Sequence, residues 1–176
     1  KQNGLPIVKA RFQNIYGPGE ILGAGIWRGT VNTIWRNVIP TFIWKALSKK
    51  SLPLENEGLN SRDFIFIEDI CFGLVQCGLA GNPGESYNLA SGTETTILNL
   101  AKLINEITNN PTPPEIKPVR AWDRSGKRFG STEKAKNEIG FEAKTNIEEG
   151  LKMTIKWTKN NKELIESNIN KHSHKI

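Results

Sequence analysis

The chain has few of the residues on which several functional classes depend. Among its 176 residues are two cysteines, two histidines, two tyrosines and one methionine. Cys71 and Cys77 stand six positions apart inside an apolar segment, a spacing that suits neither a zinc knuckle nor a CxxC redox pair. We therefore expect two ordinary buried thiols in a reducing compartment, and no metal site.

Long apolar runs are also missing. No stretch approaches the roughly 20 residues that a membrane-spanning helix needs, and no cationic start followed by an apolar segment marks a signal peptide. The net charge of +6 is spread along the chain, with Lys and Arg interleaved with Asp and Glu. These features predict a cytoplasmic protein without a membrane partner, of one domain or part of a larger one, with a mild attraction for anions.

A basic nucleic-acid-binding module is an alternative that the positive charge and five tryptophans leave open. Single-strand binders interleave aromatic and basic residues on one exposed platform. Trp27, Trp35, Trp44 and Trp157 stand among apolar neighbours instead. Packing explains these tryptophans better, so nucleic acid is not an expected partner.

Apolar periodicity and turn signals alternate along the chain in the manner of α/β proteins. The apolar run over residues 5–12 predicts a buried strand that ends at Asn14, just before a Tyr-Gly-Pro-Gly turn. The stretch over residues 17–37 reads as a long loop, and loops of that length are usually functional. Further strands are expected near residues 52–54, 64–67, 85–91 and 115–122, and helices over 38–50, 68–81 with Asp69 in its first turn, 95–110 capped by Thr95 or Thr96, 131–140 and 146–169.

Four segments carry a family resemblance that covers nearly the whole chain: RFQNIYGPG, NSRDFIFIEDI, GESYNLASGTETTILNLAKLI and RAWDRSGKRFGSTEKAKNEIGFEAKTNIEEGLKMTIKW. In this order and spacing they resemble the C-terminal half of NAD-dependent nucleotide-sugar epimerases and dehydratases. These are extended short-chain dehydrogenases/reductases similar to UDP-glucose 4-epimerase. The resemblance implies the last parallel strands of a Rossmann-type fold and a small α/β substrate-binding domain. Residues 1–176 would be the substrate-binding portion, with residues 1–16 and about 62–80 packing with the Rossmann sheet.

Two parts of the family's machinery are not found in this sequence. No glycine-rich turn between a strand and a helix is present to hold the cofactor pyrophosphate. Neither tyrosine has a lysine four positions later, because Glu20 follows Tyr16 and Ser91 follows Tyr87 at that spacing. We therefore expect an N-terminal Rossmann half to be absent, and this chain alone to hold no catalytic residues, bind no NAD and be inactive. For the full-length enzyme the resemblance implies NAD, a nucleotide diphosphate-sugar and a homodimer.

Two asparagines are candidate substrate contacts. Asn14 stands where ligands gather, at the carboxyl end of a predicted strand, and the resemblance places the matching asparagine against the nucleotide diphosphate. Its alternative role is to cap the following turn. Asn37 matches a family asparagine in the loop that reaches the sugar nucleotide, and its alternative role is the N-cap of the helix that comes next.

Further candidates come from the central part of the chain. The resemblance places Pro53 and Glu55 along the nucleobase, although Glu55 replaces the family's aromatic residue. Arg62 matches an arginine that pairs with the diphosphate, a task that suits the planar guanidinium fork. A salt bridge to Asp63 or Glu57 is the alternative role of Arg62.

The last candidates lie in the charged stretch RAWDRSGKRFGS. Arg120 and Asp123 match the family's Arg-x-x-Asp, where the arginine meets phosphate and the carboxylate takes a ribose hydroxyl. Lys127 and Arg128 either add to that anion site or form a solvated basic turn, and charge runs usually lie at the surface.

The resemblance thus implies a function in substrate binding. The chain would hold the nucleotide diphosphate-sugar substrate of an NAD-dependent 4-epimerase, which oxidises and re-reduces the sugar at C4. A nucleotide-sugar 4,6-dehydratase fragment and a non-catalytic sugar-nucleotide-binding module are the alternatives.

Overall fold

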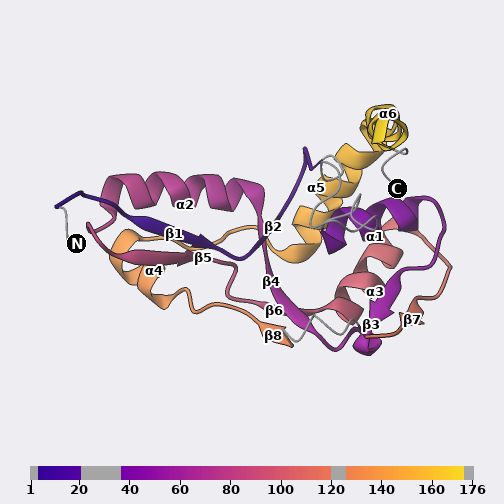
Figure 1. Ribbon diagram of the computed structural model, residues 1–176, viewed down its shortest axis with the longest axis horizontal. Helices are drawn as coiled ribbons and strands as arrows, with labels where there is room; N and C mark the ends of the chain where they lie inside the picture. The colour runs from indigo at the N-terminus through magenta and orange to yellow at the C-terminus, as the bar shows by residue number, and fades with distance from the viewer. Residues whose placement is uncertain (1–3, 21–36, 120–125, 173–176) are drawn as a thin grey trace.

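The computed structural model describes residues 4–20, 37–119 and 126–172. It is an elongated α/β molecule in which two packed regions are joined through β2 and β4 (Figure 1). The strands are β1 (Lys9–Phe12), β2 (Asn14–Tyr16), β3 (Pro53–Glu55), β4 (Ser61–Phe66), β5 (Ser86–Leu89), β6 (Glu94–Thr96), β7 (Glu115–Lys117) and β8 (Lys127–Arg128). The helices are α1 (Val38–Leu47), α2 (Ile67–Ala80), α3 (Ile97–Thr108), α4 (Glu133–Ile139), α5 (Ile147–Asn160) and α6 (Lys162–His172), with a short 3-10 helix η1 (Asn56–Gly58).

The first region is built on the parallel pair β1–β5, which lies between α2 and α4 in Figure 1. Helix α2 begins with the acidic residues Glu68 and Asp69, which suit the positive end of a helix dipole. Asp69 is buried and accepts hydrogen bonds from the backbone N–H groups of Lys144 and Thr145 at 3.1 and 3.0 Å. The core of this region is formed by Ile65, Ile70, Cys77, Tyr87, Leu89, Ala135, Ile139 and Phe141.

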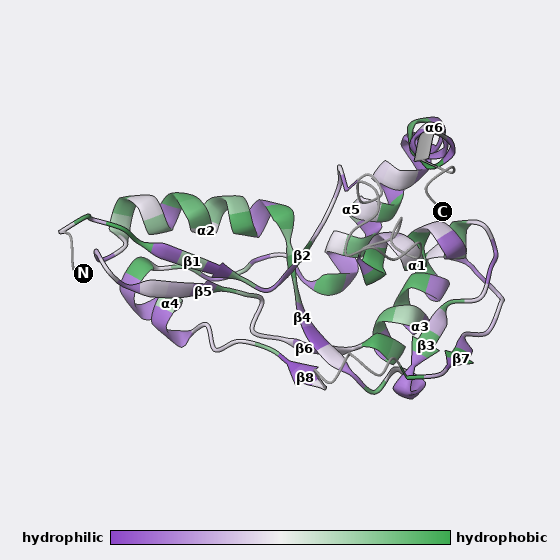
Figure 2. Cartoon of the chain, in the orientation of Figure 1, coloured by the Kyte–Doolittle hydropathy of each residue, from purple (hydrophilic) through white to green (hydrophobic). Residues whose placement is uncertain are grey.

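The second region packs α1, α3 and α5 around a larger apolar core, with the parallel pair β3–β7 at its margin. Apolar residues of both α1 and α3 belong to this core, and Figure 2 shows apolar positions along α3. Thr96 caps α3, since its side chain accepts from the Asn99 N–H at 3.1 Å, which confirms the predicted cap. The core is formed by Tyr16, Ile39, Phe42, Ile43, Ala46, Leu52, Leu54, Phe64, Phe66, Leu100, Ala101, Ile104, Leu151 and Ile155.

Strand β4 joins the two regions because its side chains alternate between them. Phe64 and Phe66 enter the core of the second region, whereas Ile65 enters the core of the first. By the same alternation Arg62 shares the face of Phe64, and Asp63 shares the face of Ile65. The strand therefore places its one arginine and its one aspartate on opposite sides.

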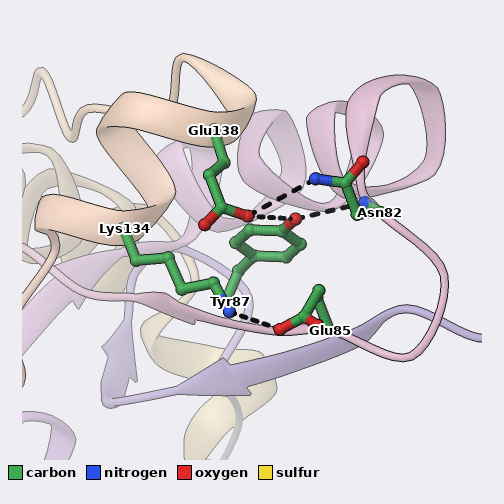
Figure 3. Close-up of polar contacts among 5 residues, drawn as sticks. All are labelled: Asn82, Glu85, Tyr87, Lys134 and Glu138. Atoms are coloured by element: carbon green, nitrogen blue, oxygen red, sulfur yellow. Dashed lines mark hydrogen bonds and ion pairs between the residues drawn. The ribbon is translucent and has the colours of Figure 1, made fainter.

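A polar network around Tyr87 fastens α4 to β5 (Figure 3). The buried Tyr87 hydroxyl donates to the Glu138 carboxylate at 2.9 Å and accepts from the Asn82 N–H at 3.1 Å. Lys134 stands over the Tyr87 ring and pairs with Glu85 at 2.7 Å, which raises the pKa of Lys134. Tyr87 therefore serves the packing of the first region, as its strand position predicts.

The start of the chain differs from the prediction of one strand over residues 5–12. Strand β1 begins only at Lys9, and Leu5 and Ile7 are 63% and 53% exposed. Asn14 does not mark the end of a strand, as predicted, but is the first residue of β2, which continues to Tyr16. The chain shifts partner at Gln13, from β5 to β4, so two short strands, one on each side of Gln13, stand in place of the single predicted strand.

The C-terminal helix and two short strands also differ from expectation. The single helix predicted over residues 146–169 is two helices, because Asn161 leaves helical geometry and its side chain donates to the Trp157 carbonyl at 2.9 Å. Strands β6 and β8 have no counterpart among the predicted strands. Both are held by pairing with β4 rather than by an apolar pattern of their own.

One of the two cysteine predictions is wrong. Cys77 is buried, whereas Cys71 is exposed, because the buried face of α2 contains Asp69, Ile70, Gly73 and Cys77 at helical spacing. Trp44 and Trp157 are half-buried, and Trp27 and Trp35 lie outside the described residues. None of the helices in the described ranges has the length and apolarity needed to cross a membrane.

Candidate functional site

A cavity of about 330 Å³ opens between the first strands, the beginning of α1 and β4. Three of the side chains that line it, Gln13, Asn14 and Asn37, are amides. Amides can donate to a phosphate or hydroxyl oxygen without adding charge. The complete lining is Phe12, Gln13, Asn14, Ile15, Tyr16, Asn37, Val38, Ile39 and Phe64.

Asn14 is placed by the parallel pairing of β2 with β4. It stands opposite Phe64 in the register, so both side chains lie on the same face. Its side-chain amide donates to the backbone carbonyl of Asp63 at 3.1 Å. The Asn14 side chain thus reaches β4, and this hydrogen bond leaves its carbonyl oxygen and one N–H available for a ligand in the cavity that it lines.

Asn37 occupies the N-cap position of α1 but does not cap it with its side chain. The side-chain amide donates to the Glu20 carboxylate instead, and the Asn37 carbonyl accepts from the Thr41 hydroxyl at 2.8 Å. The alternative role of Asn37 as the N-cap residue of α1 is therefore confirmed by its position, although its side chain makes no capping hydrogen bond. Contact with Glu20 brings the end of the Tyr-Gly-Pro-Gly turn beside the helix start, at the border of the cavity.

Arg62 lies on the face of β4 that leads to the cavity, two residues from Phe64. Its Nη1 donates to the carbonyl oxygens of Ser61 and Gly126 at 2.7 and 2.8 Å. These bonds hold the guanidinium between β4 and β8. Within the described ranges no ion pair joins Arg62 to Asp63 or Glu57, so that alternative is wrong; Asp63 lies on the opposite face.

Asp63 holds three segments around the site together from the face of β4 that is opposite the cavity. Its buried carboxylate accepts from the Ser91 N–H at 2.8 Å, the Ser91 hydroxyl at 2.7 Å and the Gly92 N–H at 2.9 Å. Its backbone carbonyl accepts from Asn14. This one residue therefore ties β4, β2 and the turn after β5 together, a role that no periodic pattern in the sequence signals.

Tyr16 contributes to packing, and its environment does not favour a role as a catalytic acid or base. Its buried ring meets Phe66 edge to face at 5.6 Å, and its hydroxyl donates to the Ile147 carbonyl at 3.4 Å. Burial, with a smaller effect of the Asp69 carboxylate, strongly raises the pKa of Tyr16. The phenol stays protonated near neutral pH.

The remaining candidates lie elsewhere. Pro53 and Glu55 are on β3, paired with β7, and they do not line the cavity. Arg120 and Asp123 lie outside the described residues. The structure thus brings together Asn14 and Asn37, with Arg62 on the adjoining face of β4.

Sequence reasoning missed Gln13 as a member of the site. Its amide packs on the backbone of Gly130, where an added Cβ would lie 2.9 Å from Gln13 Nε2. A polar residue beside Asn14 in an apolar run was the available signal. Among the described residues, no group of three or more Asp, Glu, His or Cys side chains is arranged to hold a metal ion.

Comparisons with known proteins agree on one family. Residues 1–90 match the model of the NAD dependent epimerase/dehydratase family. The enzyme WbmF of Bordetella bronchiseptica, solved in complex with NAD+ and UDP, is 59% identical with a TM-score of 0.87, over 98% of this chain and 52% of that one. UDP-glucose 4-epimerase of Thermotoga maritima, solved with UDP-glucose, is 28% identical with a TM-score of 0.75, over 88% of this chain and 46% of that one.

A curated relative combines a 4,6-dehydratase with two further activities. The trifunctional UDP-glucose 4,6-dehydratase/UDP-4-keto-6-deoxy-D-glucose 3,5-epimerase/UDP-4-keto-L-rhamnose-reductase of Arabidopsis thaliana is 28% identical over 160 residues, which are 91% of this chain and 22% of that protein. The chain thus spans about half the length of the two solved relatives and less of the plant enzyme.

Proposed function

Because the chain belongs to the NAD dependent epimerase/dehydratase family, we propose that it binds the nucleotide diphosphate-sugar substrate of an NAD-dependent nucleotide-sugar 4-epimerase. When bound, NAD would supply the oxidation of the sugar at C4 and its re-reduction. The part of this chain is to hold the nucleoside diphosphate while the sugar reacts.

The observation that carries the proposal is the polar end of the cavity. Asn14 and Asn37 line it, and Arg62 lies on the adjoining face of β4, fixed by two backbone carbonyls. A fixed guanidinium beside neutral amides suits a diphosphate, because charged hydrogen bonds to phosphate are strong and the amides add no repulsion. The UDP in the WbmF complex supports the same ligand class.

The other candidate contacts remain part of the proposal. Arg120 and Asp123 would complete the hold on the diphosphate and ribose. Pro53 and Glu55 would follow the nucleobase, at a distance from the cavity that an extended nucleotide would have to span. Residues 1–16 and about 62–80 would pack with the sheet of a cofactor-binding half, and the full-length enzyme would be a cytoplasmic homodimer.

NAD phosphates do not fit the described residues. A dinucleotide site needs a glycine-rich turn from a strand into a helix N-terminus. Strand β4 passes into α2 directly, with Glu68 and Asp69 in the first turn, and β6 passes directly into α3 at Thr96. Carboxylates in the first turn of α2 would repel the pyrophosphate, so we assign no cofactor contact to these residues.

A 4,6-dehydratase is the second candidate function, and the plant relative favours it. Both reactions begin with oxidation at C4, so they share the diphosphate site. They differ in the later steps. In a dehydratase, water is eliminated across C5 and C6, after which C6 would receive the hydride and C5 a solvent proton, whereas in an epimerase the hydride would return to C4.

One experiment distinguishes the epimerase from the dehydratase. Full-length protein would be incubated with NAD and a panel of UDP- and dTDP-hexoses in deuterated water, and the products read by NMR and mass spectrometry. An epimerase gives the C4 epimer without deuterium, and a dehydratase gives a 4-keto-6-deoxy sugar that carries deuterium. Failure of the full-length protein to bind any nucleoside diphosphate, while it binds NAD, would contradict both.

A further inference from the structure

We propose that Arg128 is a further anion-binding residue of this site, which contacts the substrate diphosphate together with Arg62. The inference rests on the proposed function and adds a residue to it. Arg128 forms the end of the two-residue strand β8, in a charged stretch that otherwise reads as a basic surface turn.

The register of the strands places Arg128 beside Arg62. Strand β8 pairs with β4 in parallel, with Lys127 opposite Ser61 and Arg128 opposite Arg62. Partnered residues of neighbouring strands project from the same face. Arg128 therefore projects from the face of Arg62 and Phe64, and Lys127 from the face of Ser61 and Asp63.

Strands β8 and β2 follow one another along one edge of β4. Strand β6 occupies the opposite edge at Ser61–Asp63, so β8 must pair from the other side. The Asp63 carbonyl, which accepts from Asn14, points to the same edge as Ser61, whose N–H donates to the Gly126 carbonyl. Gly130, just after β8, packs against Gln13, just before β2.

This arrangement puts Arg128 and Asn14 close together. Arg128 is level with Arg62, Asn14 is level with Phe64, and these two positions on β4 are separated by about 7 Å along the strand. All three polar side chains project from one face. Two guanidinium groups and one amide thus project from the same side of the strands, next to the cavity.

Charge explains why an anion belongs there. Like charges directly opposite on neighbouring strands repel, and within the described ranges no carboxylate pairs with Arg128. Lys127, by contrast, has Glu94 at 3.6 Å. A diphosphate spreads its charge over more oxygens than a monophosphate, so each of two arginines can bind a different phosphoryl group through its own fork. The pair therefore favours nucleoside diphosphates over monophosphates.

The test is calorimetric titration of the full-length protein with UDP and with UMP. Arg128→Ala should weaken UDP binding about tenfold to a hundredfold, the effect of losing a charged hydrogen bond, and should weaken UMP binding much less. Arg128→Gln tests the same loss with a side chain that keeps more of its bulk. Lys127→Ala is the matched control. It also removes one positive charge, but from the neighbouring residue, whose side chain projects from the opposite face of the strand. This variant should leave the affinities for UDP and UMP within about twofold of the parent values.

The outcomes are distinguishable. If the parent protein binds UDP while the alanine and glutamine variants bind it as Lys127→Ala does, the role of Arg128 is wrong and the proposed function stands. If the parent protein binds no UDP, the proposed function itself fails. Equal losses for UDP and UMP would contradict the role in diphosphate selectivity. Thermal unfolding of each variant would show that the fold is intact.

Discussion

At the scale of single residues, the candidate site depends on which face of β4 each side chain takes. Arg62 and Asp63 are neighbours in sequence, yet one leads to the cavity and the other ties the backbone together from behind. A sequence shows the arginine and aspartate as a possible ion pair. Only the pairing of β4 with its neighbours separates an anion-binding role from a structural one.

Arg62 and Arg120 provide the first prediction. In the full-length protein, replacing either with Ala should weaken binding of the nucleoside diphosphate by about 1.5–3 kcal/mol per lost charged hydrogen bond. The double variant should lose less than the sum, because both groups share one ligand. NAD affinity should not change. The measurement is a double-mutant cycle by calorimetry, and variants that lose NAD while they bind UDP normally would refute the assignment.

Tyr16 provides a prediction of pH dependence. Burial raises the pKa of Tyr16 above its ordinary value of 10.0, so above that pH the unfolded chain releases a proton that the folded chain retains. The free energy of unfolding should therefore be unaffected by this group below pH 10 and fall by about 1.4 kcal/mol per pH unit above it. Urea unfolding at pH 9 and 11 would measure the slope. In Tyr16→Phe the slope should be shallower, and equal slopes in both proteins would contradict a buried, protonated phenol.

At the scale of elements, long periodic segments are predictable and short paired ones are not. Helices α1, α2 and α3 follow from apolar spacing, together with the acidic start of α2 and the Thr96 cap of α3, because these signals are local. Strands β6 and β8 depend on β4 as a template, and the break at Asn161 depends on one side-chain bond to Trp157. Asn14 is identifiable as a candidate site residue from the sequence, but its position at the beginning of β2 requires knowledge of two strand partners.

Replacing two helical glycines with alanine should change the free energy of unfolding in opposite directions. An added Cβ at Gly150 in α5 would lie 2.1 Å from the Tyr16 hydroxyl, whereas at Gly78 in α2 nothing lies within 4 Å. Gly150→Ala should lower the free energy of unfolding by about 1–3 kcal/mol, and Gly78→Ala should raise it by about 0.5–1 kcal/mol.

Denaturant unfolding of the glycine variants would measure both effects. Adding Tyr16→Phe to Gly150→Ala should recover part of the loss, because it removes the clashing oxygen. If the two glycine variants shifted stability in the same direction, the close approach of α5 to β2 would be contradicted.

At the scale of the whole molecule, the first region leaves much apolar surface uncovered. Strand β1 pairs only with β5 among the described strands, so its other edge is open. Helix α2 exposes four large apolar side chains, Phe72, Leu74, Val75 and Leu79, and Figure 2 shows α2 as a largely apolar helix at the outside of the first region. Open strand edges and apolar patches promote association.

We expect this 176-residue chain to self-associate through that surface at high concentration. Sedimentation velocity over a concentration series would detect it. Val75→Lys with Leu79→Lys should reduce association, whereas Met153→Lys with Leu164→Lys, exposed apolar residues of α5 and α6, should not. A strictly monomeric, cooperatively folding chain at high concentration would argue against an open first region.

The central claim is that one face of β4 holds the diphosphate, and a crystal structure of the full-length protein with UDP tests it most directly. We expect the diphosphate beside the cavity, with oxygens within about 3.5 Å of the Asn14 amide and the Arg62 guanidinium. A diphosphate bound on the face of Asp63 and Ser91, or away from β4 altogether, would contradict it.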